Sequence, residues 1–127
     1  MQRIRLLLVE DEEAFRTTLA SRLRRRGFDV VDVESGYRAL ETAKKETFDV
    51  AIIDVEGMEG LETLREMKKI SDLVEVIMLT EDASVESATE GMRLGAFDYM
   101  MKPFDIKDLA VKIEDAYTKK LIREAWL

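Results

Sequence analysis

The sequence contains no cysteine and no histidine. These two absences exclude thiol catalysis, disulfide bonds, imidazole general bases and ordinary zinc sites. Basic residues are fewer than acidic ones: the chain has 20 Lys and Arg but 27 Asp and Glu, so its net charge is −7. No overall positive field attracts phosphates, so we do not expect the chain to bind nucleic acid directly.

Long apolar runs are absent as well. Residues 1–5 lead into only a short apolar stretch, too short for a signal peptide or a membrane span, so we expect a cytoplasmic protein that does not engage membranes. Apolar residues make up 46% and charged residues 37% of the chain, as in an ordinary soluble globule. The length suits a single domain over residues 1–127, which would bury roughly 68% of the surface of its unfolded chain.

Four short apolar runs end in polar residues. The first ends in Glu10 and Asp11, the second in Asp54, the third in Thr80 and the fourth in Lys102. If these runs are parallel strands, their ends align along one edge of the sheet, where open α/β sheets usually bind ligands. Three acids, a hydroxyl and an amine would then share one small crevice.

Strand-like and helix-like segments alternate along the whole chain. Strands are predicted at Ile4–Val9, Phe28–Val33, Val50–Asp54, Val74–Leu79 and Phe97–Met101. Helices are predicted at Glu13–Arg26, after Ser35, from after Gly60 to about Ile70, from Ser84 to Leu94, and after Asp105. Five such units with short connections predict a five-stranded, doubly wound parallel sheet of order 2-1-3-4-5. The fold class is then a flavodoxin-like, three-layer α/β sandwich.

This strand order places Glu10 and Asp11 beside Asp54. Carboxylates so crowded repel each other by about 4 kcal/mol per pair at 4 Å and an effective dielectric near 20. Oxygen ligands of this kind suit Mg²⁺, which keeps several waters and bridges to phosphate oxygens. A carboxylate can also accept a phosphoryl group, with Lys102 and the metal stabilising the transferred charge. The crevice therefore has the composition of a magnesium and phosphoryl site.

With these pieces in this order and spacing, the chain resembles the receiver domain of two-component response regulators along essentially its whole length. The matching segments are Val9–Glu12, Val50–Asp54, Val76–Thr80 and Gly95–Phe104. The resemblance implies that Asp54 is the phosphoacceptor and that Lys102 contacts the phosphoryl group. It also implies Mg²⁺ as the cofactor, held by Glu10, Asp11, Asp54 and the backbone carbonyl of Glu56. Thr80 and Tyr99 would be the switch residues, and Lys102–Pro103 a cis peptide.

The resemblance also implies a signalling role. The domain would take a phosphoryl group from a histidine kinase or a phosphotransfer protein, with Mg²⁺-assisted self-phosphorylation and slow autodephosphorylation as its only chemistry. The face made by the segments 84–94, 97–101 and 105–117 would then change. That face would meet a downstream protein, a covalently linked output domain or a second copy, and the chain could be the N-terminal part of a longer response regulator.

Other readings share the layout. A receiver-like domain that only docks partners would follow if its metal site were impaired. A haloacid-dehalogenase-type phosphohydrolase would need a second Asp shortly after the first strand, whereas Asp11 is followed by Glu12 and Glu13. A flavin binder would need a phosphate loop rich in glycine and hydroxyls there, and these acids would repel a phosphate.

Two departures from the family pattern stand out. The segment Asp54–Gly60 lacks a Met-Pro pair and is two residues short, which removes up to roughly 7 Å of reach. We expect an intact sheet, an irregular start of the following helix, and a metal site weakened on the Glu56 side. Acidic Glu81 and Asp82 follow Thr80 where small residues are usual. Either their charge slows phosphorylation or alters dephosphorylation, or both side chains point to solvent and have no effect.

Reinserting Met-Pro after Glu56 is therefore predicted to tighten Mg²⁺ binding, because it restores the reach of the loop that carries a metal ligand. Calorimetric titration with Mg²⁺ measures this. An unchanged affinity, together with a well-ordered native loop in a crystal, would show that the chain satisfies the geometry in another way.

Overall fold

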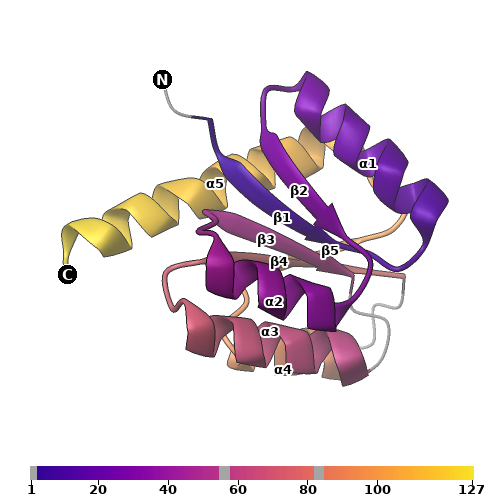
Figure 1. Ribbon diagram of the computed structural model, residues 1–127. Coiled ribbons are helices and arrows are strands. Elements are labelled where there is room, and N and C mark those ends of the chain that lie inside the picture. The colour runs from indigo at the N-terminus through magenta and orange to yellow at the C-terminus, as the bar shows by residue number, and fades with distance from the viewer. Residues whose placement is uncertain (1–2, 55–57, 82–84) are drawn as a thin grey trace.

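Five parallel strands form a single central sheet (Figure 1). The structure is a computed structural model, and it describes residues 3–54, 58–81 and 85–127. The strands are β1 (Arg5–Val9), β2 (Asp29–Val33), β3 (Val50–Asp54), β4 (Glu75–Thr80) and β5 (Asp98–Met101). Their order is β2-β1-β3-β4-β5, which confirms the predicted doubly wound sheet.

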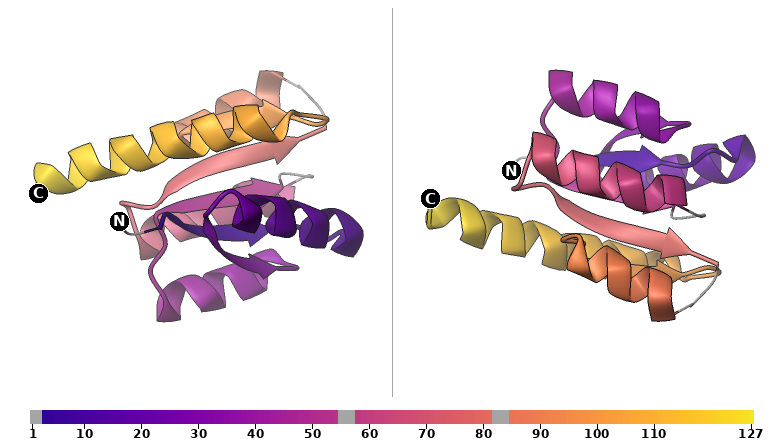
Figure 2. Two further views of the ribbon diagram at one scale, coloured as in Figure 1. Left: turned by 90° about the horizontal axis from the view of Figure 1, so that it is seen from above. Right: turned by 90° about the horizontal axis from the view of Figure 1, so that it is seen from below.

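Helices cover both faces of the sheet, so the molecule has three layers (Figure 2). The helices are α1 (Glu13–Arg25), α2 (Gly36–Lys45), α3 (Met58–Ile70), α4 (Val85–Arg93) and α5 (Ile106–Ala125). Helices α1 and α5 lie on one face, and α2, α3 and α4 lie on the other. No helix of the described residues is both long and apolar enough to cross a membrane.

Each face of the sheet has its own hydrophobic core, because successive side chains of a strand point to opposite faces. Strand β1 shows this, since Leu6 and Leu8 pack towards α1 and α5 while Leu7 packs towards α2 and α3. The central strands are buried on both faces, as expected of a parallel sheet covered by helices. Strand β2 lies at the edge, which agrees with the two aspartates in its sequence.

Several predicted helix ends are confirmed. The Ser35 side chain accepts a hydrogen bond from the Arg38 amide, and Asp105 accepts one from the Lys107 amide, so both residues cap helices. Gly27 and Gly95 follow α1 and α4 with φ angles of 95° and 105°, a left-handed conformation that favours glycine. Ser84, where the fourth helix was predicted to begin, lies outside the described residues.

Most other boundaries differ from the prediction by one residue, and the start of α3 differs by more. Helix α3 was expected to begin after Gly60 with an irregular start, but it is α-helical from Met58. Acidic Glu59 in the first turn suits a helix N-terminus, and Gly60 costs little near a helix end, so the chain can begin the helix early. Strand β4 is shifted by one residue, because buried Glu75 pairs with Val50 and Thr80 completes the strand.

Glu75 is a buried carboxylate at the end of the sheet where β4 begins, with an exposed fraction of 1%. Its Oε1 lies 3.0 Å from Arg123 of α5 and 3.7 Å from Lys68 of α3, and its Oε2 lies 3.5 Å from Lys119. Burial lowers the pKa of Lys68, and the attraction of Glu75 offsets this only in part. One carboxylate thus joins helices on opposite faces of the sheet.

The substitution Glu75→Ala is expected to lower the free energy of unfolding by about 3 kcal/mol, because removing one partner of a buried ion pair leaves the other charges uncompensated. Asp72→Ala is the matched control. It removes another acid partner of Arg123, but the Asp72 side chain is 79% exposed and its loss should cost under about 1 kcal/mol. Urea denaturation measures both values, and equal losses would mean that Glu75 does not anchor α5.

Candidate functional site

The carboxyl ends of β1 and β3 bring three acids together. Val9 at the end of β1 pairs with Ile53 of β3, so Glu10 and Asp11 follow on one side and Asp54 ends the strand on the other. One carboxylate oxygen from each of the three acids lies within 4.8 Å of the others. The predicted juxtaposition of Glu10, Asp11 and Asp54 is therefore present in the structure.

Lys102, which follows β5, reaches across the sheet edge to two of these acids. Its Nζ donates a hydrogen bond of 2.7 Å to Asp54 Oδ2 and one of 3.0 Å to Glu10 Oε1. Burial lowers the pKa of the Lys102 ammonium, but the hydrogen bonds to Asp54 and Glu10 outweigh that effect and the net pKa is raised. Lys102 therefore stays charged and partly compensates the acids.

An aromatic ring supports the same ammonium from α1. Lys102 Nζ lies 4.4 Å from the centroid of the Phe15 ring, and Phe15 packs edge-on against Phe104 at 6.4 Å between centroids. A cation over a ring face is attracted by the ring quadrupole. The sequence does not reveal this role of Phe15, since helical spacing shows no contact with a residue 87 positions away.

Asp54 ends β3, and its side chain is only 6% exposed. The cost of burying this carboxylate is offset on one oxygen by Lys102. The other oxygen, Oδ1, is buried and has no hydrogen-bond partner among the described residues. A buried, unpaired carboxylate oxygen beside two further acids fits a cation ligand, so the residues present suit the Mg²⁺ that the sequence predicted.

A pocket of about 60 Å³ opens at these acids. Its lining comes from the ends of β1, β2 and β3 and the first turns of α2 and α3, and comprises Val9, Glu10, Asp11, Glu34, Ser35, Gly36, Ile53, Asp54, Glu59, Gly60 and Thr63. Five of these lining residues are acids. Among the described residues, no Lys or Arg lines the pocket. The pocket therefore favours a cation. Glu34 and Glu59 were not predicted as lining residues, because loop and helix starts do not show their direction in sequence.

A glycine lets α2 and α3 approach closely at this pocket. A Cβ atom on Gly36 would lie 2.1 Å from Oγ1 of Thr63, so no larger residue fits there unless Thr63 moves. Thr63 is buried and donates a hydrogen bond of 2.8 Å to the Glu59 carbonyl. Gly36 thus holds the first turns of the two helices together beside the acids.

The remaining predicted residues lie around this centre. Thr80 is buried at the end of β4, and its carbonyl accepts a hydrogen bond of 2.8 Å from the Lys102 amide. Tyr99 on β5 is 39% exposed, and the Lys102–Pro103 peptide is cis. Glu81 is exposed. The predicted ligand Glu56 and the acidic Asp82 lie outside the described residues.

Residues 6–114 match the family model of the response regulator receiver domain. The chain belongs to this family. The family, the fold and the assignment to two-component signalling predicted from the sequence are thereby confirmed.

Curated relatives of this receiver domain include transcriptional regulators. It is 36% identical over 115 residues to the transcriptional regulatory protein ZraR of Escherichia coli K12, covering 89% of this chain and 26% of that protein. It is 34% identical over 118 residues to the uncharacterized transcriptional regulatory protein YkoG of Bacillus subtilis, covering 91% of this chain and 52% of that protein. The receiver domain thus spans between a quarter and about half of the length of these relatives.

Solved structures show the same fold. A CheY-like receiver domain protein from Methanospirillum hungatei has a TM-score of 0.90 at 28% identity, covering 96% of this chain and 99% of that one. The beryllofluoride-activated NtrC4 receiver domain dimer has a TM-score of 0.84 at 26% identity, covering 91% of this chain and 98% of that one.

Removing one acid tests whether the cluster is a cation site. Asp11→Asn should raise the free energy of unfolding by about 1 kcal/mol without metal, because it relieves repulsion at a partly solvated carboxylate. It should also abolish the rise in melting temperature that Mg²⁺ gives the wild type by mass action. The control Glu12→Gln removes an equal charge one residue away and should retain that rise. If millimolar Mg²⁺ leaves the melting temperature of the wild type unchanged, the acids repel one another without forming a usable cation site.

Proposed function

We propose that this receiver domain accepts a phosphoryl group on Asp54 from a histidine kinase or a phosphotransfer protein. The observation that carries the proposal is the state of the Asp54 carboxylate. One of its oxygens is held by Lys102, whereas the other is buried and has no hydrogen-bond partner among the described residues, and the carboxylate belongs to the acid cluster. A carboxylate held beside a cluster of acids that suits a divalent ion can act as a nucleophile towards phosphorus.

In the proposed transfer, a carboxylate oxygen of Asp54 attacks the phosphorus atom and forms the new oxygen–phosphorus bond. The bond between phosphorus and the donor nitrogen breaks, and its electron pair stays with the donor. Lys102 remains protonated throughout, since its pKa is raised by its two carboxylate partners, and it stabilises the negative charge of the transferred group. The reaction gives an aspartyl phosphate on this chain, and its hydrolysis restores Asp54.

The acid cluster supplies the ligands for the divalent ion. Glu10, Asp11 and Asp54 would hold Mg²⁺, with the Glu56 carbonyl proposed as a further ligand from its place in the sequence. When bound, Mg²⁺ supplies positive charge that lets the anionic phosphoryl group approach the acids. The same charge removes the repulsion among the carboxylates.

The proposed output is a shift between two conformations. Thr80 and Tyr99 are the proposed switch residues, and Lys102 links them to the site because its amide binds the Thr80 carbonyl. Tyr99 is more than one-third exposed, so an inward turn of its ring would change the surface. Large shifts in such an equilibrium need up to about 5.5 kcal/mol of differential stabilisation, for which new charge-assisted bonds to the phosphoryl group are the proposed source.

The face of α4, β5 and α5 is the proposed partner surface. Large apolar side chains are exposed on each of its three elements, namely Met92, Tyr99, Met101 and Val111. Exposed apolar side chains on these three elements are what a partner surface would bury. The partner is a downstream protein, an output domain in the same chain or a second copy. The length of the curated relatives supports the proposal that residues 1–127 are the receiver part of a longer regulator.

Incubation with a small-molecule phosphodonor and Mg²⁺ should add one phosphoryl group that is labile in base, measured by intact-protein mass spectrometry. Asp54→Asn should abolish the addition, because the amide oxygen is a poor nucleophile and carries no charge. Asp115→Asn, which changes an exposed acid on α5, should leave it unchanged.

Label uptake by Asp54→Asn at the wild-type rate would refute the assignment of Asp54. A wild type that binds Mg²⁺ but takes up no phosphoryl group from any donor would instead favour a receiver-like domain that docks partners without phosphorylation.

A further inference from the structure

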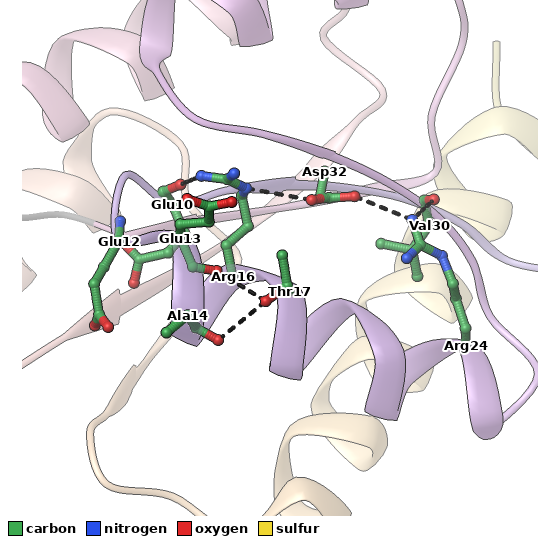
Figure 3. A network of polar contacts seen from close by, with 9 residues as sticks. All are labelled: Glu10, Glu12, Glu13, Ala14, Arg16, Thr17, Arg24, Val30 and Asp32. Carbon is green, nitrogen blue, oxygen red and sulfur yellow. Dashed lines mark hydrogen bonds and ion pairs between the residues drawn. The ribbon is translucent and has the colours of Figure 1, made fainter.

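Arg16 on α1 contacts the backbone of the acid site from outside the pocket. Its Nη1 donates a hydrogen bond of 3.0 Å to the carbonyl oxygen of Glu10 (Figure 3). Its Nε lies 3.3 Å from Oδ2 of Asp32 on the edge strand β2. The Arg16 side chain is only 14% exposed, so its guanidinium is held between the two partners rather than spread in solvent.

Glu10 itself is held at every polar group that it offers. Its amide donates to the Val33 carbonyl at 3.1 Å, and its two carboxylate oxygens accept from Lys102 and from the Glu12 amide. The Arg16 contact secures the one remaining group, the carbonyl. This carbonyl belongs to the peptide that leads directly into Asp11.

Asp11 lacks such support. It is exposed, it lies in the bend between β1 and α1, and no hydrogen bond within the described residues holds its carboxylate. The position of that carboxylate relative to Asp54 is therefore set by the backbone of the bend. In addition to the bond between the Glu10 amide and Val33, the Arg16 side chain ties this backbone to β2 through Asp32.

We propose that Arg16 is a positioning residue for the cation site. By joining the Glu10 carbonyl to Asp32, it fixes the bend that places the Asp11 carboxylate beside Asp54. The inference rests on the proposed function, because the geometry matters only if the acids bind a divalent ion. It extends that function to a residue that does not line the pocket.

Charge and position predict opposite effects for this residue. A positive charge close to the acids repels a divalent cation, so an account based on charge alone predicts tighter Mg²⁺ binding when Arg16 is removed. A positioning role predicts weaker binding, because groups that orient the ligands of a metal typically contribute about 10- to 100-fold in affinity.

The α1 helix offers a matched control in Arg24. Its Nη2 lies 3.1 Å from Oδ1 of the same Asp32 and donates to the Val30 carbonyl, so it shares the carboxylate partner of Arg16 (Figure 3). The contacts of Arg24 do not include Glu10. Arg24→Met therefore removes the same charge and the same partner without freeing the bend.

The test is calorimetric titration of Mg²⁺ into wild type, Arg16→Met, Arg16→Lys and Arg24→Met. Arg16→Met should weaken Mg²⁺ binding about tenfold. Arg16→Lys should also weaken it, because lysine keeps the charge but not the guanidinium fork that reaches both partners. Arg24→Met should stay within about twofold of the wild type. Amide NMR shifts of residues 10–12 should move in the Arg16 variants and not in Arg24→Met.

The outcomes are distinguishable. A wild type that binds Mg²⁺, with folded Arg16 variants that bind it equally well or more tightly, would overturn the positioning role and leave the proposed function standing. A wild type that does not bind Mg²⁺ at all would overturn both. If Arg16→Met does not fold, Arg16→Lys, which keeps the bulk and charge of the side chain, decides the same question.

Discussion

The Lys102 ammonium lies between two carboxylates that would otherwise repel each other, and the arrangement of the acid site depends on this contact. Asp54 and Glu10 are almost fully buried, and each gives one oxygen to Lys102. Without a cation, burying either carboxylate would cost several kcal/mol. With one lysine and three acids the compensation is incomplete, and the buried Asp54 Oδ1 has no partner in the described chain. The acids thus lack sufficient positive charge at this point, and the proposed divalent ion would supply it.

Some residues around the site are held by several contacts, whereas others are more exposed. Glu10 is fixed by Lys102, Arg16 and the edge strand, and the far end of the sheet is fixed by the ion pairs of Glu75 with α3 and α5. Tyr99 is more than one-third exposed on a short edge strand. In the proposed switch, a change in charge at Asp54 would act next to these fixed groups, and Lys102, whose amide binds Thr80, would link the acids to the proposed partner face.

Much of this arrangement could be predicted from the sequence. Apolar runs that end in acids, a hydroxyl and a lysine predicted the sheet, its strand order and the meeting of Glu10, Asp11 and Asp54, because parallel strands align their ends. The start of α3 and the burial of Glu75 could not be predicted. Near glycines, the local sequence gives little indication of where a helix begins. A buried acid can be recognised only when the distant basic side chains that contact it are known. The roles of Phe15 and Arg16 were hidden for the same reason, since a helical pattern shows a residue's face but not its partners.

The central claim is that this sheet edge holds one divalent cation between Glu10, Asp11 and Asp54. The most direct measurement is the anomalous difference density of a crystal of the wild-type protein grown with Mn²⁺, which shares the preference of Mg²⁺ for oxygen ligands. The account predicts one peak in contact with the carboxylates of these acids and beside the unpaired oxygen of Asp54. A peak elsewhere on the surface, or none at saturating Mn²⁺, would contradict it.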